Sequence, residues 1–366
     1  MKSTVIYFSG DPFQVGGGAT VAYNILSNIR QTDSVTLVTS RWADVPKEIA
    51  DSIDVVRVWM PKKRVAIEFF DQIIAPFLLM IMRPKRVICL NSILPILYPY
   101  RIDLFFQMRM FYFDDINSAS KKIKNFLGIL SIKRANNVYC ASIDHATDVE
   151  RRLNVEPGKI KVVHLGCKSP SMVQNPSVSG RGNKLIFVSV IRPYKNLHGL
   201  IEAVIQAKHL RPDLPIRLQV VGEPANYLGI DKYMADIKMR IQHASVDKSI
   251  EFLGSRSNSE VLELMSSSKA LIFPTLFEGF GLPLLEAMAT ITPVISSSVN
   301  SLPEIGGDTV EYFDVDDPKT LVQKIIDLYD VGYDSNKVEC AFSRSKLFCW
   351  QKTTRAVLLN ESFIVR

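Results

Sequence analysis

The sequence predicts an α/β protein with two parallel sheets, each in its own domain. Short continuous apolar runs, such as ALIF at 270–273, are bounded by proline, glycine or polar residues and alternate with segments of helical periodicity. Such runs are typical of strands buried on both faces, which occur in parallel sheets. The chain has 366 residues, of which 47% are hydrophobic, so it is long enough to form two cores. Segment 168–183 has the composition of a linker, and we therefore expect domains at 1–167 and 184–341.

The first domain contains a series of strand-like runs. They lie at 5–9, 35–39, 55–59, 87–90, 103–107, 137–141 and 162–166, with helices expected near 20–29 and 143–153. Between the first strand and the first helix, the glycines at 16–18 allow a tight turn whose backbone N–H groups face a ligand. Gly17 and Gly18 are the candidates for close approach. A plain flexible loop is the alternative interpretation.

The second domain shows the same alternation. Strands are expected at 185–190, 217–221, 250–254 and 270–273, and helices near 317–330 and 335–346. Lys195 lies just past the first of these strands and before a segment of helical periodicity, where a cation can meet a phosphate group. Gly222 follows the second strand at the same edge of the predicted sheet.

The stretch EGFGLPLLE, from Glu278 to Glu286, carries the strongest functional signal. Pro283 suits the first turn of a helix, and four residues before or at that turn offer unpaired backbone N–H groups where the helix dipole is positive: Gly279, Phe280, Gly281 and Leu282. Such groups bind phosphate, and the two flanking glutamates supply the acceptors that sugar hydroxyls need. A ligand that combines a diphosphate with a group rich in hydroxyls is a nucleotide sugar. For one glutamate alone, simple compensation of the helix dipole is the alternative.

This motif resembles the glutamate pair of the retaining glycosyltransferases of family 4, and the resemblance continues through PVISS and SLPEIGGD. It implies the GT-B fold, in which two Rossmann-like domains with parallel sheets face each other across a cleft and a closing helix at 342–366 crosses back to the first domain. It also implies that Glu278 contacts the transferring sugar, that Glu286 contacts the ribose, and that Lys195 contacts the diphosphate, with Gly17, Gly18 and Gly222 near the donor. Two positions depart from the pattern. Val190 stands where the family has an arginine, which Arg192 is a candidate to replace, and Ile291 stands where it has a glycine.

Polar residues follow the strands at 87–90 and 103–107 in the first domain. Ligands of open parallel sheets lie beyond the carboxyl ends of the strands, so these residues are expected to line the acceptor side of the cleft. The candidates are Asn91, Gln107, Arg109 and Asp114, with a solvated turn as the alternative for Asp114. The family's usual histidine in this region is absent, and His145 and His164 are interpreted as structural.

Cations bracket an apolar segment at 61–86. Lys62, Lys63 and Arg64 precede it, and Arg83, Lys85 and Arg86 close it. This pattern fits a helix lying in a membrane interface, because the segment is too short and too polar to span a bilayer. The alternative is a core helix with a solvated basic edge, which Pro76 favours because proline is expected to break a continuous interfacial helix.

Together these features predict a cytoplasmic, retaining glycosyltransferase that moves a sugar from a nucleotide-diphosphate sugar to a glycan or lipid-linked glycan in bacterial surface polysaccharide synthesis. The alternatives are a catalytically silent nucleotide-sugar-binding subunit and a GT-B sugar-nucleotide epimerase. We expect no cofactor and no obligatory metal, because no DxD-like pair stands at the motif.

Scattered cysteines without a CxxC pair favour a reducing compartment, and the start of the sequence predicts no secretory signal. The net charge of +7 favours peripheral attachment to an anionic inner leaflet, and we expect no nucleic-acid partner.

Overall fold

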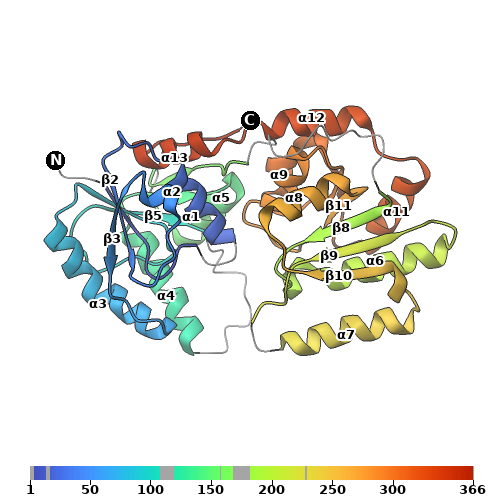
Figure 1. Ribbon diagram of the computed structural model, residues 1–366, viewed down its shortest axis with the longest axis horizontal. Helices are drawn as coiled ribbons and strands as arrows, with labels where there is room; N and C mark the ends of the chain where they lie inside the picture. Colours follow the sequence, from blue (N-terminus) through green and yellow to red (C-terminus); the bar gives the residue numbers. More distant parts are fainter. Residues whose placement is uncertain are drawn as a thin grey trace. The chain divides into compact units, whose positions relative to one another are not determined.

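The structure, a computed structural model, describes residues 4–13, 17–107, 119–156, 158–167, 182–226 and 229–365 (Figure 1). The chain divides into two compact units. The first unit combines Met1–Gly166 with Cys349–Arg366, and the second is Cys167–Phe348. Most of the predicted linker, and the candidates Arg109 and Asp114, lie outside the described residues.

Within its described residues, the first unit has a seven-stranded parallel sheet in the order β3-β2-β1-β4-β5-β6-β7. Its strands are β1 (Thr4–Tyr7), β2 (Val35–Ser40), β3 (Asp54–Val58), β4 (Arg86–Cys89), β5 (Ile102–Phe106), β6 (Val138–Cys140) and β7 (Ile160–Val162). The expected strand at 162–166 is therefore misplaced. The residues after β7 lie beside the C-terminal segment instead, where the Phe363 N–H donates to the Val162 carbonyl at 2.9 Å and the His164 N–H donates to the Phe363 carbonyl at 2.8 Å.

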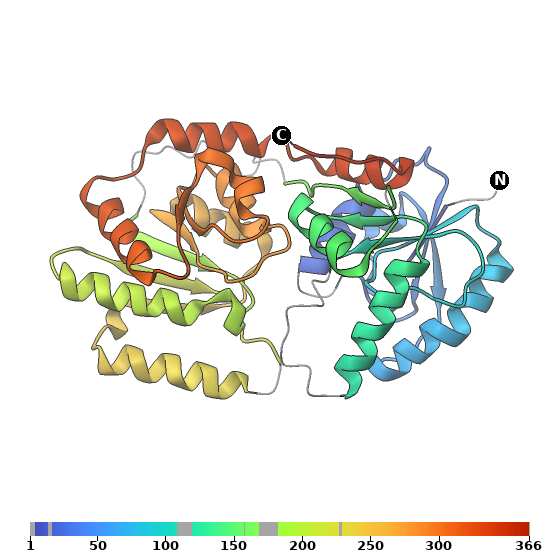
Figure 2. The same cartoon turned by 180° about the vertical axis from the view of Figure 1, so that it is seen from behind.

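Helices cover both faces of this sheet. They are α1 (Gly17–Ser27), α2 (Lys47–Ala50), α3 (Arg64–Met82), α4 (Ala119–Arg134), α5 (Ile143–Leu153) and α13 (Trp350–Leu359). Helices α3, α4 and α5 share one core with the sheet, whereas α13 packs against α1 on the opposite face (Figures 1 and 2). A Cβ atom at Gly166 would lie 2.1 Å from the backbone nitrogen of Trp350, so only glycine lets α13 begin at this position.

Buried polar groups fasten the C-terminal segment to the first unit. The buried His164 accepts a hydrogen bond at Nδ1 from the Val365 N–H at 3.0 Å, and its carbonyl accepts one from Thr353 Oγ1 at 2.7 Å. Arg86, which the sequence groups with the basic residues around the apolar segment, has a structural role here. Its guanidinium pairs with the buried Asp103 and donates to the Leu358 carbonyl at 2.5 Å, so it stabilises the last turn of α13.

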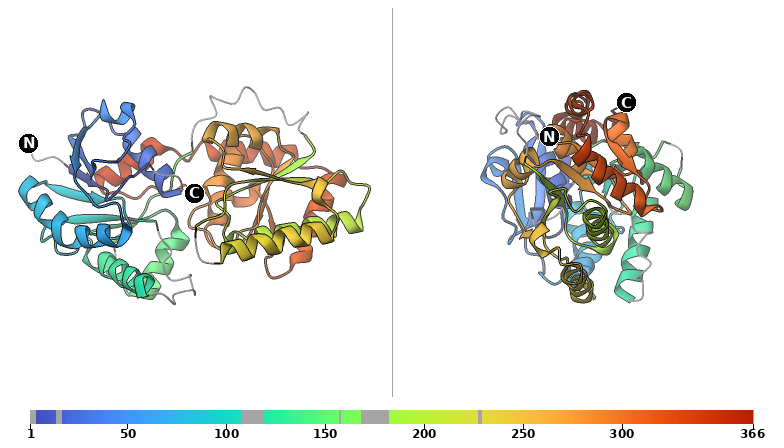
Figure 3. Two further views of the ribbon diagram at one scale, coloured as in Figure 1. Left: turned by 60° about the horizontal axis from the view of Figure 1, so that its bottom comes forward. Right: turned by 90° about the vertical axis from the view of Figure 1, so that its right-hand side faces the viewer.

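The described part of the second unit has a six-stranded parallel sheet in the order β10-β9-β8-β11-β12-β13. Its strands are β8 (Lys184–Val188), β9 (Arg217–Val221), β10 (Ile250–Gly254), β11 (Ala270–Phe273), β12 (Val294–Ser297) and β13 (Glu311–Phe313). Its helices are α6 (Leu197–Leu210), α7 (Ile230–His243), α8 (Asn258–Ser267), α9 (Leu282–Ala289), α10 (Leu302–Gly306), α11 (Pro318–Asp330) and α12 (Ser335–Ser345). Helices α6, α7 and α11 lie on one face of the sheet and α8, α9 and α12 on the other (Figures 1 and 3).

Helix α9 ends in a Schellman motif whose left-handed residue is an isoleucine. The Ile291 N–H bonds the Met288 carbonyl at 3.2 Å and the Thr292 N–H bonds the Ala287 carbonyl at 2.8 Å, which is the pairing of that motif. Ile291 takes a φ of 58°, a conformation that costs an L-residue roughly 1–2 kcal/mol. The departure from the family's glycine therefore leaves strain in the turn between α9 and β12.

Replacing Ile291 with glycine is expected to stabilise the protein relative to the alanine variant at the same position. Both variants remove the side chain, but alanine keeps the Cβ that is strained at positive φ, so glycine should have a free energy of unfolding about 1 kcal/mol higher. Urea unfolding of the two variants measures this difference. If alanine were as stable as glycine, the backbone at residue 291 would carry no strain.

Candidate active site

The carboxyl ends of β8 and β11 form the topological switch point of the second sheet. These two strands are neighbours, and the chain leaves β8 toward β9 and β11 toward β12, on opposite sides. Such divergence opens a crevice beyond the strand ends, where ligands of open α/β sheets bind. Lys195 ends a 3-10 turn (Pro193–Lys195) after β8, and Glu278 lies in the loop after β11. The structure thus brings two sequence-predicted residues to the same switch point.

Lys195 and Glu278 form a close ion pair. Lys195 Nζ lies 2.5 Å from Glu278 Oε2, and both side chains are mostly buried, at 14% and 16% exposure. The other carboxylate oxygen, Oε1, accepts a hydrogen bond from the Gly279 N–H at 3.1 Å. The ammonium also lies 5.2 Å from the ring centroid of Tyr194 and 5.6 Å from that of Phe273. The pair places a positive charge and a hydrogen-bond acceptor side by side at the crevice.

Hydrogen bonds to backbone atoms connect the loop after β8 with the loop after β11. The Leu276 N–H donates to the Tyr194 carbonyl at 2.8 Å, and the buried Thr275 donates from Oγ1 to the same carbonyl at 3.1 Å and to the Phe277 carbonyl at 2.8 Å. The backbone N–H of Glu278 donates to Asn300 Oδ1 at 3.3 Å. The loop that carries Lys195 and the loop that carries Glu278 are thereby fixed to each other, as preorganised charge stabilisation requires.

The start of α9 has the glycine geometry that the motif predicts. Gly281 is the N-cap residue, with φ of 97°, and a Cβ there would lie 2.7 Å from a Leu302 methyl group. A Cβ at Gly279 would meet nothing within 4 Å among the described residues, so there is space beside its Cα atom. Phe280, in contrast, is buried, and its ring packs edge-on against Phe348 with centroids 6.0 Å apart. Its side chain is therefore a core anchor, and only its backbone can face a ligand.

The remaining donor-side candidates lie on α9 and at the ends of β8 and β9. Glu286 is one turn into α9, and Leu282 begins that helix. Gly222 follows β9 with φ of 132°, and a Cβ there would lie 1.9 Å from the Ser189 carbonyl oxygen, so only glycine lets the two strand ends approach this closely. Arg192 is the residue before the 3-10 turn, and Val190 is 41% exposed in the same loop.

The switch point of the first sheet lies between β1 and β4, and several candidates meet there. Gly17 and Gly18 form the first turn of α1, and not a loop before it as the sequence predicted, because the helix begins three residues early. A Cβ at Gly18 would lie 3.1 Å from Gln107 Oε1, so α1 packs closely on the end of β5. Asn91, after β4, donates from Nδ2 to Ser9 Oγ after β1. Among the described residues, Asn91 Oδ1 and Gln107 Nε2 are buried without a hydrogen-bond partner.

Sequence reasoning missed a buried acid beside this group. Asp71 on α3 is 4% exposed and accepts a hydrogen bond from the Tyr7 hydroxyl at 2.6 Å. Burial raises the pKa of Asp71 to about 7, although hydrogen bonds from Tyr7 and Ser9 act in the opposite direction. The available signal was the presence of Asp71 and Gln72 in an apolar stretch, which indicated only that the segment does not span a membrane.

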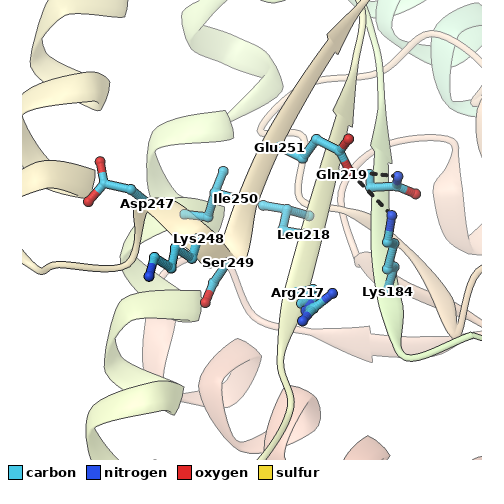
Figure 4. Close-up of a pocket in the computed structure, with 9 residues that line it drawn as sticks. All are labelled: Lys184, Arg217, Leu218, Gln219, Asp247, Lys248, Ser249, Ile250 and Glu251. Atoms are coloured by element: carbon cyan, nitrogen blue, oxygen red, sulfur yellow. Dashed lines mark hydrogen bonds and ion pairs between the residues drawn. The ribbon is translucent and has the colours of Figure 1, made fainter.

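A separate hollow of about 280 Å³ lies at the amino-terminal part of β8, β9 and β10 (Figure 4). Glu251 lines it, with Oε2 3.3 Å from Lys184 Nζ and 3.0 Å from Gln219 Nε2. The hollow lies at the amino-terminal ends of these strands, whereas Lys195 and Glu278 follow the carboxyl ends of β8 and β11. It therefore does not belong to the switch point.

No group of three or more His, Cys, Asp or Glu side chains in the described ranges is arranged to hold a metal ion. The expectation of metal-independent chemistry remains a prediction that a chelator tests.

Comparisons with known proteins agree with this geometry. Residues 171–339 match the family described as Glycosyl transferases group 1. The chain is similar to the O-antigen chain mannosyltransferase RfbU of Salmonella typhimurium, with 27% identity over 237 residues that cover 64% of this chain and 63% of that protein. It is also similar to O-antigen chain mannosyltransferase B of Escherichia coli, with 25% identity over 61% of this chain and 60% of that protein. The chain thus spans less than two thirds of the length of these relatives.

Solved structures share the fold over nearly the whole chain. WaaG, a glycosyltransferase involved in lipopolysaccharide biosynthesis, has a TM-score of 0.74 at 15% identity and covers 97% of this chain and 99% of its own. Anabaena HepE, determined in complex with UDP-glucose, has a TM-score of 0.72 at 15% identity and covers 98% of both chains. At this identity the likeness shows the fold alone, and it confirms the predicted α/β architecture of the GT-B type.

Proposed function

We propose that this chain, whose residues 171–339 match the family Glycosyl transferases group 1, is a retaining glycosyltransferase of that family that uses a nucleotide-diphosphate sugar. The observation that carries the proposal is the Lys195–Glu278 pair at the switch point of the second sheet, with N···O 2.5 Å, next to Gly279, where a side chain would meet no described atom within 4 Å. A cation and a helix N-terminus suit the diphosphate, and a carboxylate suits the hydroxyls of the sugar. Glu286 is the proposed partner of the ribose.

In the proposed reaction the bond between the anomeric carbon and the diphosphate oxygen breaks, and the acceptor hydroxyl forms the new bond on the same face of the sugar. The acceptor proton passes to the departing diphosphate. Negative charge develops on that leaving group, and Lys195 together with the backbone N–H groups of 279–282 would stabilise it without a metal ion. Arg192 is the proposed second cation, in place of the arginine that Val190 replaces.

The acceptor is proposed to be a glycan or lipid-linked glycan of a bacterial surface polysaccharide. The similarity to O-antigen mannosyltransferases supports this class and makes nucleotide-activated mannose the first donor to test. Two described acceptor-side candidates, Asn91 and Gln107, support it as well, because each has a buried polar atom that the described residues leave without a partner. An acceptor atom and a donor group of this kind suit a sugar hydroxyl. The enzyme would work in the cytoplasm at the inner face of the membrane.

The test is to incubate the purified chain with GDP-mannose, UDP-glucose and UDP-galactose and to measure the nucleoside diphosphate released, with and without excess EDTA. We expect slow release from at least one donor, with water as the acceptor, and the same rate in EDTA. Donor binding without any release would indicate a silent binding subunit, and conversion to an epimeric sugar nucleotide would indicate an epimerase. Loss of release in EDTA, restored by Mg²⁺ or Mn²⁺, would contradict the metal-independent mechanism.

A further inference from the structure

Helix α3 has an apolar face that points away from the core. Four residues at four-residue spacing, Phe69, Ile73, Phe77 and Ile81, form a ridge along the helix, which we call the α3 ridge. Their exposed fractions are 66%, 38%, 61% and 79%. Other side chains of α3, namely Phe70, Ala75 and Leu79, are buried in the core of the first unit. The four side chains of the ridge are therefore not part of the core of the first unit.

The helix is continuous, which corrects the sequence prediction that Pro76 breaks it. It runs as one element of 19 residues from Arg64 to Met82 with Pro76 inside, a length of roughly 28 Å at 1.5 Å per residue. Pro76 is buried, so the packing of this face outweighs the backbone hydrogen bond that proline removes. The exposed ridge thus extends along an unbroken helix, and the argument against an interfacial helix no longer holds.

Exposed cations stand at both ends of the ridge. Lys62 and Lys63 lie before the first turn, and Arg83 and Lys85 lie after the last. Across the described part of the chain, no helix has both the length and the apolar character to cross a bilayer. A helix that is apolar along one exposed face and cationic at its two ends matches the interface of an anionic bilayer, where the ridge enters the acyl boundary and the cations meet the headgroups.

We propose that the α3 ridge docks the protein on an anionic lipid bilayer. This deepens the proposed function and rests on it, because a lipid-linked acceptor is reached at a bilayer surface. A second copy of the chain is a poorer occupant. Pairing two ridges, parallel or antiparallel, brings the cations at the end of one helix next to cations of the other, and like charges oppose that contact. Anionic headgroups neutralise both ends at once.

The experiment measures co-sedimentation of the full chain with vesicles of neutral phosphatidylcholine and with vesicles containing 30% phosphatidylglycerol. We expect binding to the anionic vesicles only, weakening as salt is raised. The double variant Phe69→Gln/Phe77→Gln should lower the partition coefficient at least tenfold, and Lys62→Gln/Lys63→Gln should lower it and reduce its salt dependence. The matched control, Leu210→Gln/Val331→Gln, removes two exposed apolar residues of the second unit and should bind as the unaltered chain does.

Equal binding to both vesicle types, or an unchanged partition coefficient in the ridge variant, would overturn the proposal. Light scattering completes the test, because conversion of a dimer to a monomer by Phe69→Gln/Phe77→Gln would identify the ridge as a contact between copies and would also overturn it. Release of nucleoside diphosphate, measured without vesicles, should be equal in the ridge variant and the unaltered chain. Vesicle binding without any such release would contradict the proposed function and leave the docking surface standing.

Discussion

Replacing Lys195 with alanine is expected to lower kcat/KM for the donor by about 10- to 150-fold, as a charged hydrogen bond of about 1.5–3 kcal/mol is lost from the transition state. The ammonium lies at the switch point of the second sheet, where the diphosphate is proposed to bind. The loss should fall mainly on kcat, because charge on the leaving group grows as the glycosidic bond breaks. Steady-state assays of donor hydrolysis measure it.

Two further variants show whether the loss of kcat/KM is specific to Lys195. Lys232→Ala removes an exposed lysine on α7 and should leave kcat/KM unchanged, so it controls for the loss of one surface charge. If Arg192 is the proposed second cation, Arg192→Ala should lower kcat/KM as strongly as Lys195→Ala does. A milder loss in Arg192→Ala would mean that Arg192 is only a surface residue and has not taken over the role of the arginine that Val190 replaces. An unchanged kcat/KM in Lys195→Ala would refute the assignment of this lysine.

Strands such as β11 could be predicted because burial on two faces produces a continuous apolar run in the sequence. The expected strands at 270–273, 217–221 and 250–254 coincide with β11, β9 and β10, whereas β12 and β13 were not among the expected strands. Helices α2, α4, α7, α8 and α10 were not predicted. Lysines and other polar residues interrupt the apolar positions of α4, so its sequence carries little periodic signal, and it is held by contacts such as Ser131 Oγ accepting from the Leu94 N–H at 2.9 Å. Such contacts cannot be seen from the segment itself.

The residues of the candidate site could be named from the sequence, but their spatial arrangement could be predicted only where local backbone geometry dictates it. The glycines and the proline around the start of α9 are local requirements, and the structure shows Gly281 at positive φ as its cap. The ion pair joins residues 83 positions apart and depends on which strands become neighbours, which no local pattern specifies. Arg86 illustrates the converse, because its place beside Arg83 and Lys85 suggested a surface role, whereas its partners are Asp103 and the end of α13.

Replacing Glu278 with glutamine is expected to separate two proposed roles of the switch point, which are contact with the transferring sugar and binding of the diphosphate. The amide keeps the shape of the side chain but loses the charge that accepts from the sugar hydroxyl, so kcat should fall by about 10- to 100-fold. Affinity for the free nucleoside diphosphate should stay the same or increase. The carboxylate pairs with Lys195 at 2.5 Å, and a diphosphate must compete with it for that cation.

Calorimetric titration with the nucleoside diphosphate and steady-state assays with the sugar nucleotide measure the two quantities on the same variant. Asp314→Asn, which alters an exposed acid after β13, is the control for loss of one negative charge and should change neither. A wild-type kcat in Glu278→Gln would remove the glutamate from the proposed mechanism. A large loss of diphosphate affinity would instead mean that Glu278 acts chiefly by holding Lys195 in position, since without the charge the lysine would leave the crevice.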